Sequence, residues 1–418
     1  MTKDGSPRFF YGYIIVIVSF LIIFVLHGSY STYGVFFNPL QMEFNWSRTL
    51  ISGANSLAFF FDGLFAVVAG RLTDRFGPRV VMVVAALMVG VGYSLLSRID
   101  TAWQLYFLYG AIVGMSMGSA NVTLLSTTAR WFVKRRGLMS GLVKVGTGTG
   151  MLVMPLVASW LIAGHGWRDS YLILGIGSAL IILLVAQLLR RDPADKGLQP
   201  LGALQLEPGS KGLAEMGLTL GEATKARQFW AVCAVYFISW YITRTIMVHI
   251  VPHALDMGFT VVQAASIISA VGGSSILGRM VMGATADKVG TRRALVISFA
   301  IIAVAFSWLQ LADELWALYL FAGVYGFAHG GFFALVSPLV AELMGIKAHG
   351  IILGVVLFIS QIGGAVGSVV TGGIFDLTGS YQLAFLISLV FGIVGLGLAS
   401  SLKPISIHAQ SGSLRDSG

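Results

Sequence analysis

A ten-residue pattern that occurs twice decides the fold of this chain. Residues 70–79 read GRLTDRFGPR, and residues 283–292 read GATADKVGTR. Each copy has a glycine, an aspartate four positions later, a basic residue, a second glycine and a second basic residue. These are Gly70, Asp74, Arg75, Gly77 and Arg79 in the first copy, and Gly283, Asp287, Lys288, Gly290 and Arg292 in the second. The two aspartates are 213 positions apart. We therefore predict that the chain contains two copies of one structural unit.

The same offset of 213 positions recurs elsewhere. It relates four further pairs of glycines, which are Gly137 and Gly350, Gly141 and Gly354, Gly150 and Gly363, and Gly166 and Gly379. Agreement at five separated places indicates two halves in parallel orientation. Such halves are related by a pseudo-two-fold axis normal to a membrane and enclose a cavity between them.

The composition is that of a membrane protein. Of the 418 residues, 56% are hydrophobic, 11% are charged and 52 are glycine, and the mean hydropathy is +0.84. Soluble domains carry roughly 25% charged residues, so these values exclude a soluble enzyme, a disordered chain and a disulfide scaffold. Cys233 is the only cysteine and leaves no intrachain disulfide or multi-cysteine metal site. The chain has no Walker sequence, so we do not expect an ATPase. We expect no enzymatic activity, no metal and no cofactor.

Twelve apolar runs can cross a bilayer, which takes about 20 residues each. They cover residues 12–37, 50–70, 80–97, 103–126, 138–163, 168–189, 229–251, 260–283, 293–311, 315–338, 350–373 and 381–402. The predicted fold is an all-α membrane protein with twelve transmembrane helices in two pseudo-symmetric six-helix halves.

The two halves are expected at residues 1–189 and 229–402. Residues 190–228 form the one long polar stretch and predict a cytoplasmic linker, and residues 403–418 predict a cytoplasmic tail. Within the linker, Thr219 and Glu222 have the spacing of a capping box and predict a short helix before the seventh span.

Basic residues predict the orientation. With this topology, 21 of the 27 Lys and Arg residues lie on the side of the termini, three lie on the other side and three lie within helices. The positive-inside rule then predicts that both termini are cytoplasmic. The membrane is expected to be the plasma membrane, which is the bacterial inner membrane. The net charge of +9 therefore reflects topology and does not indicate a nucleic-acid partner.

The paired loops resemble the cytoplasmic signature of the major facilitator superfamily, which follows its second and eighth helices. The resemblance covers the whole chain. It implies that Asp74 and Asp287 act in a charge lock at the inner gate, because an aspartate at a helix N-terminus beside a basic residue forms a strong, charge-assisted contact. The alternative is that the loops only obey the positive-inside rule.

Three further segments resemble bacterial monocarboxylate transporters and their oxalate/formate antiporter relatives. These are RFFYGY at residues 8–13, HIVPH at residues 249–253, and the Gly278-Arg279 pair. The resemblance implies small organic anions as substrates and an intramembrane arginine that holds the carboxylate. Arg279 occupies that position.

The chain departs from these relatives at several positions. Animal members have an aspartate where this chain has Ser275, and a helix-one lysine where it has Ser31. The 213-residue offset pairs these positions with Asp62 and Arg244, so both charges reappear in the opposite half. Oxalate-selective relatives use a second cation in helix eleven, where this chain offers only Gln361, which disfavours oxalate.

Four charged residues lie inside predicted spans, away from the span ends: Asp62, Lys144, Arg244 and Arg279. Such residues cost at least ~2.5–3.5 kcal/mol each to insert and usually face a wet cavity or a partner. The surplus of positive charge predicts an anionic substrate and disfavours export of lipophilic cations. Arg279 is the predicted carboxylate ligand because its planar fork matches two oxygens.

The other three charges each leave an alternative. Lys144 contacts substrate or extends to the interface, and Arg244 is a second anchor or a structural residue. Asp62 is predicted to carry the coupled proton, because an anion that occupies Arg279 would remove a partner of the ionised carboxylate. The alternative for Asp62 is a structural salt bridge.

Uncharged and histidine side chains complete the predicted substrate site. They are Asn121, His249, Tyr30, Tyr33, His329, Phe332 and Gln361, with His27 and Phe333 as further lining residues. His249 is also a candidate proton carrier. Ordinary helix packing is the alternative for each of them.

The predicted function is transport of a small monocarboxylate, similar to lactate or pyruvate, together with a proton, by alternating access in a monomer embedded in the lipid bilayer. An anion exchanger of the oxalate/formate kind is the first alternative, followed by an exporter of hydrophobic compounds. A membrane sensor without transport activity would need a signalling domain, for which the linker is too short.

Overall fold

The computed structural model describes residues 10–202 and 217–402; residues 1–9, 203–216 and 403–418, which include the predicted tail, part of the linker and Arg8 and Phe9 of the RFFYGY segment, lie outside the described residues. The described chain is almost entirely helical. Its helices are α1 (Gly12–Ser31), α2 (Tyr33–Phe44), α3 (Arg48–Phe76), α4 (Pro78–Leu96), α5 (Ala102–Leu105), η1 (Tyr106–Val113), α6 (Gly114–Trp131), α7 (Arg136–Ala186), η2 (Pro193–Lys196), α8 (Leu220–Ala223), α9 (Arg227–Asp256), α10 (Val261–Val289), α11 (Thr291–Leu309), α12 (Leu315–Met344), α13 (His349–Thr378) and α14 (Gln382–Ser401).

The twelve predicted spans are present. Eleven helical stretches of the described chain are long and apolar enough to cross a membrane, and the 51-residue α7 contains two of the predicted spans. Its backbone leaves helical geometry at Gly166, where φ is 75°, a left-handed value that favours glycine. The first span extends beyond residue 37, because α2 continues from α1 as far as Phe44. The protein is therefore a multi-pass membrane protein.

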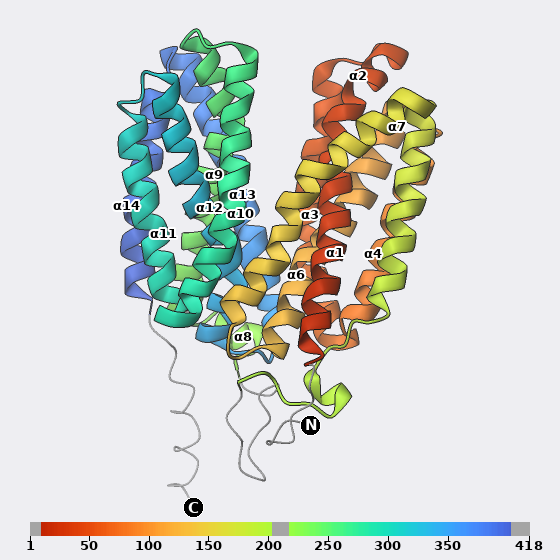
Figure 1. Cartoon of the computed structure of the whole chain (residues 1–418), viewed down its shortest axis with the longest axis vertical. Helices are drawn as coiled ribbons and strands as arrows, with labels where there is room; N and C mark the ends of the chain where they lie inside the picture. The colour runs from red at the N-terminus through yellow and green to blue at the C-terminus, as the bar shows by residue number, and fades with distance from the viewer. Residues whose placement is uncertain (1–9, 203–216, 403–418) are drawn as a thin grey trace, which may run out of the picture.

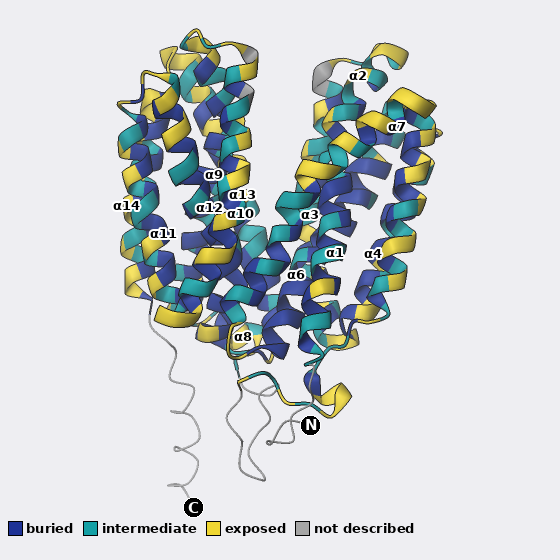
Figure 2. Ribbon diagram, in the orientation of Figure 1, coloured by how far each residue is buried: buried dark blue, intermediate teal, exposed yellow. Residues whose placement is uncertain are grey.

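The helices form two bundles that meet at one end (Figure 1). α1 to α7 make up the first bundle and α9 to α14 the second, and contacts between them run from α3 to α13 and from α7 to α10 and α12. We call the end at which α1 begins and α14 ends the terminal side, and the opposite end the far side. Figure 2 shows buried residues inside each bundle and where the bundles meet, and exposed residues on the outer surfaces.

Glycines make the close approach between the bundles possible. Added Cβ atoms at Gly70 and Gly350 would overlap each other's backbone, and the same holds for Gly137 and Gly283. One turn further from the terminal side, Gly354 packs on the backbone of Ala66, and Gly141 packs on the backbone of Arg279. The repeat predicted from the sequence thus reappears as two equivalent contact lines.

One helix pair departs from the offset of 213. Gly114 packs on Ala58 and Gly326 packs on Val271, so these glycines are 212 positions apart although their partners are 213 apart. The π-helical segment η1, just before Gly114, accommodates the extra residue in its wider turn. The π turn therefore shifts the register of α6 relative to α12 by one position.

The described ends of the linker are tied to equivalent places in the two bundles. The carbonyl of Leu201 accepts hydrogen bonds from Val133 and Lys134 at the end of α6, and the N–H of Leu218 donates to Met344 at the end of α12. The predicted short helix is present as α8, with Thr219 and Glu222 forming the expected capping box. The backbone N–H of Thr219, followed by its hydroxyl, lowers the pKa of Glu222.

Candidate functional site

The four charged residues predicted within the membrane come together from four helices. Asp62 on α3 interacts electrostatically with Lys144 on α7 and with Arg244 on α9, and Lys144 also interacts with Arg279 on α10. We call these four residues the charged layer. It combines three cations with one carboxylate, and both bundles contribute to it.

Aromatic rings, rather than carboxylates, support the cations. Lys144 Nζ lies 5.3 Å and the Arg279 guanidinium carbon 5.4 Å from the ring centroid of Phe333, and Arg244 lies 4.1 Å from the ring of Phe59. Within the described residues, no ion pair of 4.0 Å or less joins Asp62 to a cation. Cation–π contacts are attractive but leave the charge in place, so the layer keeps its positive surplus.

Arg279 has unused hydrogen-bonding capacity. Its side chain is buried, yet Nε and Nη1 have no hydrogen-bond partner. A Cβ atom at Gly148 would overlap Nη1, so this glycine leaves the room that the guanidinium occupies. Buried donors without partners are costly, and a charged one favours an anion that can accept its hydrogen bonds.

Lys144 belongs to a chain of three polar residues. Its Nζ donates to Asn121 Oδ1 at 2.6 Å, and Asn121 Nδ2 lies 3.1 Å from His27 Nε2. The lysine is 5% exposed, so its side chain turns into the charged layer and does not extend to the membrane interface. Because Lys144 has three N–H donors and this chain occupies one, the lysine retains capacity for an anion.

Asp62 is bound by the opposite bundle. The side-chain amide of Gln361 on α13 donates to Asp62 Oδ2 at 2.6 Å. In this structure Asp62 is thus held by a hydrogen bond from Gln361 and not by a salt bridge. Gln361 lies within the layer as the carboxylate's partner.

The predicted aromatic wall is only partly at the charged layer. Phe332 packs on Phe299 inside the second bundle at 4.8 Å between ring centroids, and its neighbour Phe333 faces the cations instead. Tyr33 is also packed away from the layer, since its hydroxyl donates to the carbonyl of Ile51 and its ring stacks on Tyr109. In this structure Phe332 and Tyr33 therefore pack within their own bundles. Phe332 and Phe333 face different surroundings because neighbouring positions on a helix point about 100° apart.

Tyr30 and His329 do lie near the charges. Tyr30 interacts electrostatically with Asp62 and Arg244 and packs against Phe59. His329 is close to Arg279 and Arg244, and neither of its ring nitrogens has a hydrogen-bond partner.

His249 lies elsewhere. Its Nε2 is 3.0 Å from the carbonyl oxygen of Ser368, and its ring lies beside Tyr381. These contacts are within the second bundle, so the structure does not bring His249 to the charged layer. No group of three or more His, Cys, Asp or Glu among the described residues is arranged to hold a metal ion.

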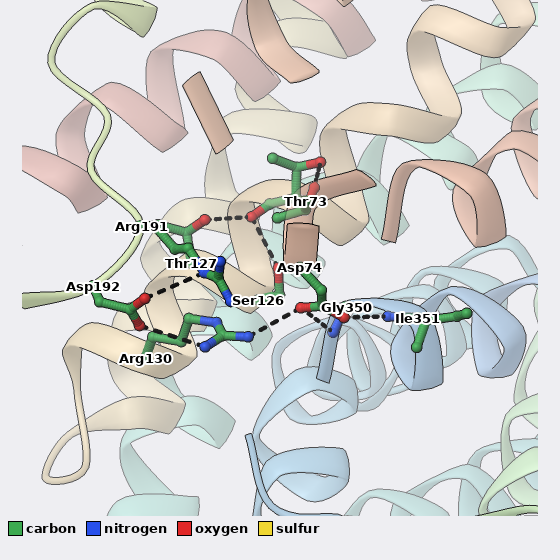
Figure 3. Close-up of polar contacts among 10 residues, drawn as sticks. Thr73, Asp74, Ser126, Thr127, Arg130, Arg191, Asp192, Gly350 and Ile351 are labelled. Atoms are coloured by element: carbon green, nitrogen blue, oxygen red, sulfur yellow. Dashed lines mark hydrogen bonds and ion pairs between the residues drawn. The ribbon is translucent and has the colours of Figure 1, made fainter. Parts of the chain in front are cut away.

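At the terminal side, Asp74 joins the two bundles (Figure 3). Its Oδ1 accepts from Arg130 Nη2 at 3.0 Å and from the N–H of Gly350 at 3.3 Å, while Oδ2 accepts from the N–H of Ile351 at 3.0 Å. Arg130 also lies 3.4 Å from Asp192, at the start of the linker. An aspartate of α3 thus caps the N-terminus of α13 in the opposite bundle.

Asp287 makes the equivalent contact in the other direction. It accepts from the N–H groups of Gly137 and Leu138 at 2.7 and 2.8 Å and so caps the start of α7. Beside it is a cavity of about 490 Å³ whose lining includes Arg135, Arg136 and Glu342. Unlike Asp74, Asp287 has no arginine within 4.0 Å among the described ion pairs.

The basic residues of the repeated pattern have other partners. Arg79 donates to Gln187 within the first bundle, and Arg292 donates to Ser400 within the second, again 213 positions away. Arg75 lies over the ring of its neighbour Phe76, and Lys288 is exposed. Among the described ion pairs, the basic partner of Asp74 is therefore Arg130 of α6 and not a residue of the repeated pattern.

Sequence reasoning missed Arg130, whose only signal is a basic residue at the end of the fourth span, and Phe59, which no sequence signal distinguishes from other membrane aromatics. Phe59 contacts Arg244 of the opposite bundle, and Arg130 binds Asp74, which in turn caps α13 of that bundle. Their importance depends on how the bundles meet.

Two bundles with a repeated plan, joined by reciprocal aspartate caps and enclosing a buried cationic layer, define a transporter made from a duplicated six-helix unit. The comparisons with known proteins agree. The model of the Major Facilitator Superfamily matches residues 19–290 and 232–414. This chain belongs to that superfamily and is a transporter rather than an enzyme.

Relatives of known name are similar over nearly the whole chain. Monocarboxylate transporter 13 of Rattus norvegicus is 25% identical over 96% of this chain and 91% of its own length. The oxalate:formate antiporter of Oxalobacter formigenes is 23% identical over 95% of this chain and 92% of its own length.

A solved structure shows the same fold. FucP in the outward conformation matches with a TM-score of 0.73 at 15% identity and covers 94% of this chain and 100% of its own.

Proposed function

We propose that this protein transports a small monocarboxylate together with a proton, and that Arg279 binds the carboxylate. The observation that carries the proposal is a buried arginine with two unpartnered guanidinium nitrogens in a layer of three cations and one carboxylate. Such a layer attracts an anion, and the fork of Arg279 suits two carboxylate oxygens. Monocarboxylate transporters among the relatives support the same substrate class.

The contacts between the bundles support alternating access. They extend from the aspartate caps at the terminal side to the charged layer. Toward the far side the bundles diverge (Figure 1). A substrate that binds at the layer would arrive from the far side, and rocking of the bundles would break the aspartate caps to release it at the terminal side. Asp74 and Asp287 are thus the proposed gate.

Asp62 is the proposed proton carrier, because it is the one carboxylate of the layer. Arg244 and Lys144 both act on it, so a bound anion that draws these cations toward itself makes protonation easier. The distribution of basic residues supports a cytoplasmic terminal side in a bacterial inner membrane. We propose that a single chain performs the cycle.

Anion exchange is the second candidate. Lys144 and Arg279 both lie against the ring of Phe333, so two cations are close together and could bind the two carboxylates of a dicarboxylate. One relative is named an oxalate:formate antiporter.

The test is uptake of labelled lactate, pyruvate, acetate, formate and oxalate into proteoliposomes, with and without an imposed pH gradient. Protein-free liposomes are the control. Accumulation of a monocarboxylate driven by the pH gradient alone supports the proposal. Uptake that requires an anion on the opposite side, and ignores the pH gradient, supports exchange instead.

A further inference from the structure

The hydrogen bond between Gln361 and Asp62 lies at a mechanically important place. α3 meets α13 at Gly70 with Gly350, then at Ala66 with Gly354, then at Gly63 with Gln361. One turn further, Phe59 of α3 contacts Arg244 of α9, which is the contact of α3 with the second bundle nearest the far side in this series. The bond therefore connects the two bundles at the depth where they begin to diverge.

Gln361 is well positioned to keep this bond. A Cβ atom added at Gly63 would lie 3.3 Å from both Cβ and Cγ of Gln361, so the glutamine side chain packs directly on the α3 backbone. Its amide then reaches Asp62 Oδ2 at 2.6 Å. Among the described residues of the charged layer, the Gln361–Asp62 hydrogen bond connects the two bundles, whereas the bonds of Lys144 and His27 to Asn121 stay within the first bundle.

The strength of the bond depends on the charge of Asp62. An amide N–H bound to an ionised carboxylate makes a hydrogen bond roughly twice as strong as a neutral one. A protonated Asp62 accepts less strongly, and it can donate its own proton only if the amide turns. Loss of the negative charge therefore weakens a contact that holds α3 against α13.

We propose that Gln361 is a positioning residue that couples the protonation of Asp62 to the movement of the bundles. The ionised carboxylate holds the terminal side closed through Gln361, and protonation favours opening to the terminal side. The inference rests on the proposed function, since it takes Asp62 as the proton carrier. It explains how an anion without a proton is kept from crossing.

Other groups around Asp62 do not form an alternative bridge. Lys144 from α7, Arg244 from α9 and Tyr30 from α1 face it electrostatically, and α6 contributes Gly118, which packs on its backbone carbonyl. Lys144, Arg244 and Tyr30 respond to its charge, but Gln361 is the described group that donates a hydrogen bond to it from the other bundle.

A cysteine reporter can measure the opening directly. Ser56 is exposed one turn from Phe59 on the same helix face, toward the far side. In a full-length Cys233→Ser background, the rate at which Ser56→Cys reacts with a water-soluble maleimide reports the far-side-open form. Rates are measured without substrate between about pH 5 and pH 8 and divided by those in Asp62→Asn, which removes the titration of the thiol itself.

We expect the normalised labelling rate to fall about fivefold on acidification. This factor corresponds to the difference in free energy between a hydrogen bond to an ionised carboxylate and one to a neutral carboxyl group. Gln361→Met keeps the packing on Gly63 but removes the amide, and we expect it to abolish this pH dependence. Ser360→Ala is the matched control, because the Ser360 hydroxyl bonds locally to the carbonyl of Leu357, and it should behave like the parent.

An unchanged pH dependence in Gln361→Met overturns the inference. If that variant also retains proton-driven uptake, the proposed function stands and Gln361 merely packs. If the parent shows no proton-driven uptake but its labelling depends on pH and on Gln361, the proposed function fails while the conformational link remains.

Discussion

Replacing Asp74 by asparagine removes a charge from the contact that joins α3 to α13 at the terminal side, which is part of the proposed gate. The carboxylate accepts three hydrogen bonds through its two oxygens, from Arg130, Gly350 and Ile351. Asparagine has the same shape but one oxygen only. Whichever way its amide points, an N–H group then faces at least one backbone N–H of α13.

The size of the effect follows from these contacts. A buried N–H without an acceptor costs about 1–3 kcal/mol, and the bond from Arg130 loses its ionic partner. Together these changes disfavour the closed form by about 3 kcal/mol, or roughly 100-fold in the equilibrium between the two forms. Arg130 keeps Asp192 at 3.4 Å, which prevents a larger loss.

Asp287→Asn is the matched comparison. Asp287 accepts two backbone bonds, has no arginine within 4.0 Å among the described ion pairs and is exposed, so water replaces what asparagine loses. We expect a shift of about 1 kcal/mol, roughly fivefold.

Both variants are read with the Ser56→Cys labelling assay and with transport rates. Labelling should fall strongly in Asp74→Asn and slightly in Asp287→Asn, and turnover should slow more than substrate affinity changes, because a lock biases conformations without touching substrate. Equal effects in the two variants, or a collapse of affinity with normal turnover, would refute this account of the gate.

Three further outcomes are expected. Arg279→Lys should abolish or greatly reduce transport in a protein that still folds, because lysine lacks the bidentate fork; a near-normal KM and rate would exclude Arg279 as the carboxylate ligand. Asp62→Asn should lose accumulation driven by a pH gradient yet keep anion exchange in counterflow, and proton-driven concentration by this variant would make Asp62 structural. Phe333→Leu should weaken substrate binding about tenfold through loss of two cation–π contacts, whereas Phe332→Leu should affect thermal stability rather than KM; the reverse pattern would contradict the assignment of the two rings.

The sequence alone determined the twelve spans and the duplicated plan. Hydropathy acts over each helix separately, and the glycines that pack between helices must recur wherever the same contact recurs. For this reason the offset of 213 positions from Asp74 to Asp287 also predicts which backbone N–H groups, at Gly137 and Gly350, lie in equivalent places.

Partners across the two bundles required the tertiary structure. Asp62 and Gln361 are 299 positions apart, and nothing local to either residue indicates the other. Arg130 and Asp74 lie in the same bundle, but they are 56 positions apart and on different helices, so nothing local to either residue indicates this pair. The partners of a side chain are the groups that lie near it in the folded chain. Which groups these are depends on how the helices pack together.

The direction in which each side chain points also depended on the fold. The π turn in η1 shifts α6 by one position relative to α12, so Phe333 rather than Ala334 occupies the place that matches Asn121. A shift of one residue turns a helix face by about 100°, which separates Phe333 at the cations from Phe332 in the packed interior. The sequence shows which residue types each helix contains. The rotation of each helix about its own axis, which decides where those side chains point, is determined only by the packing of the helices against one another.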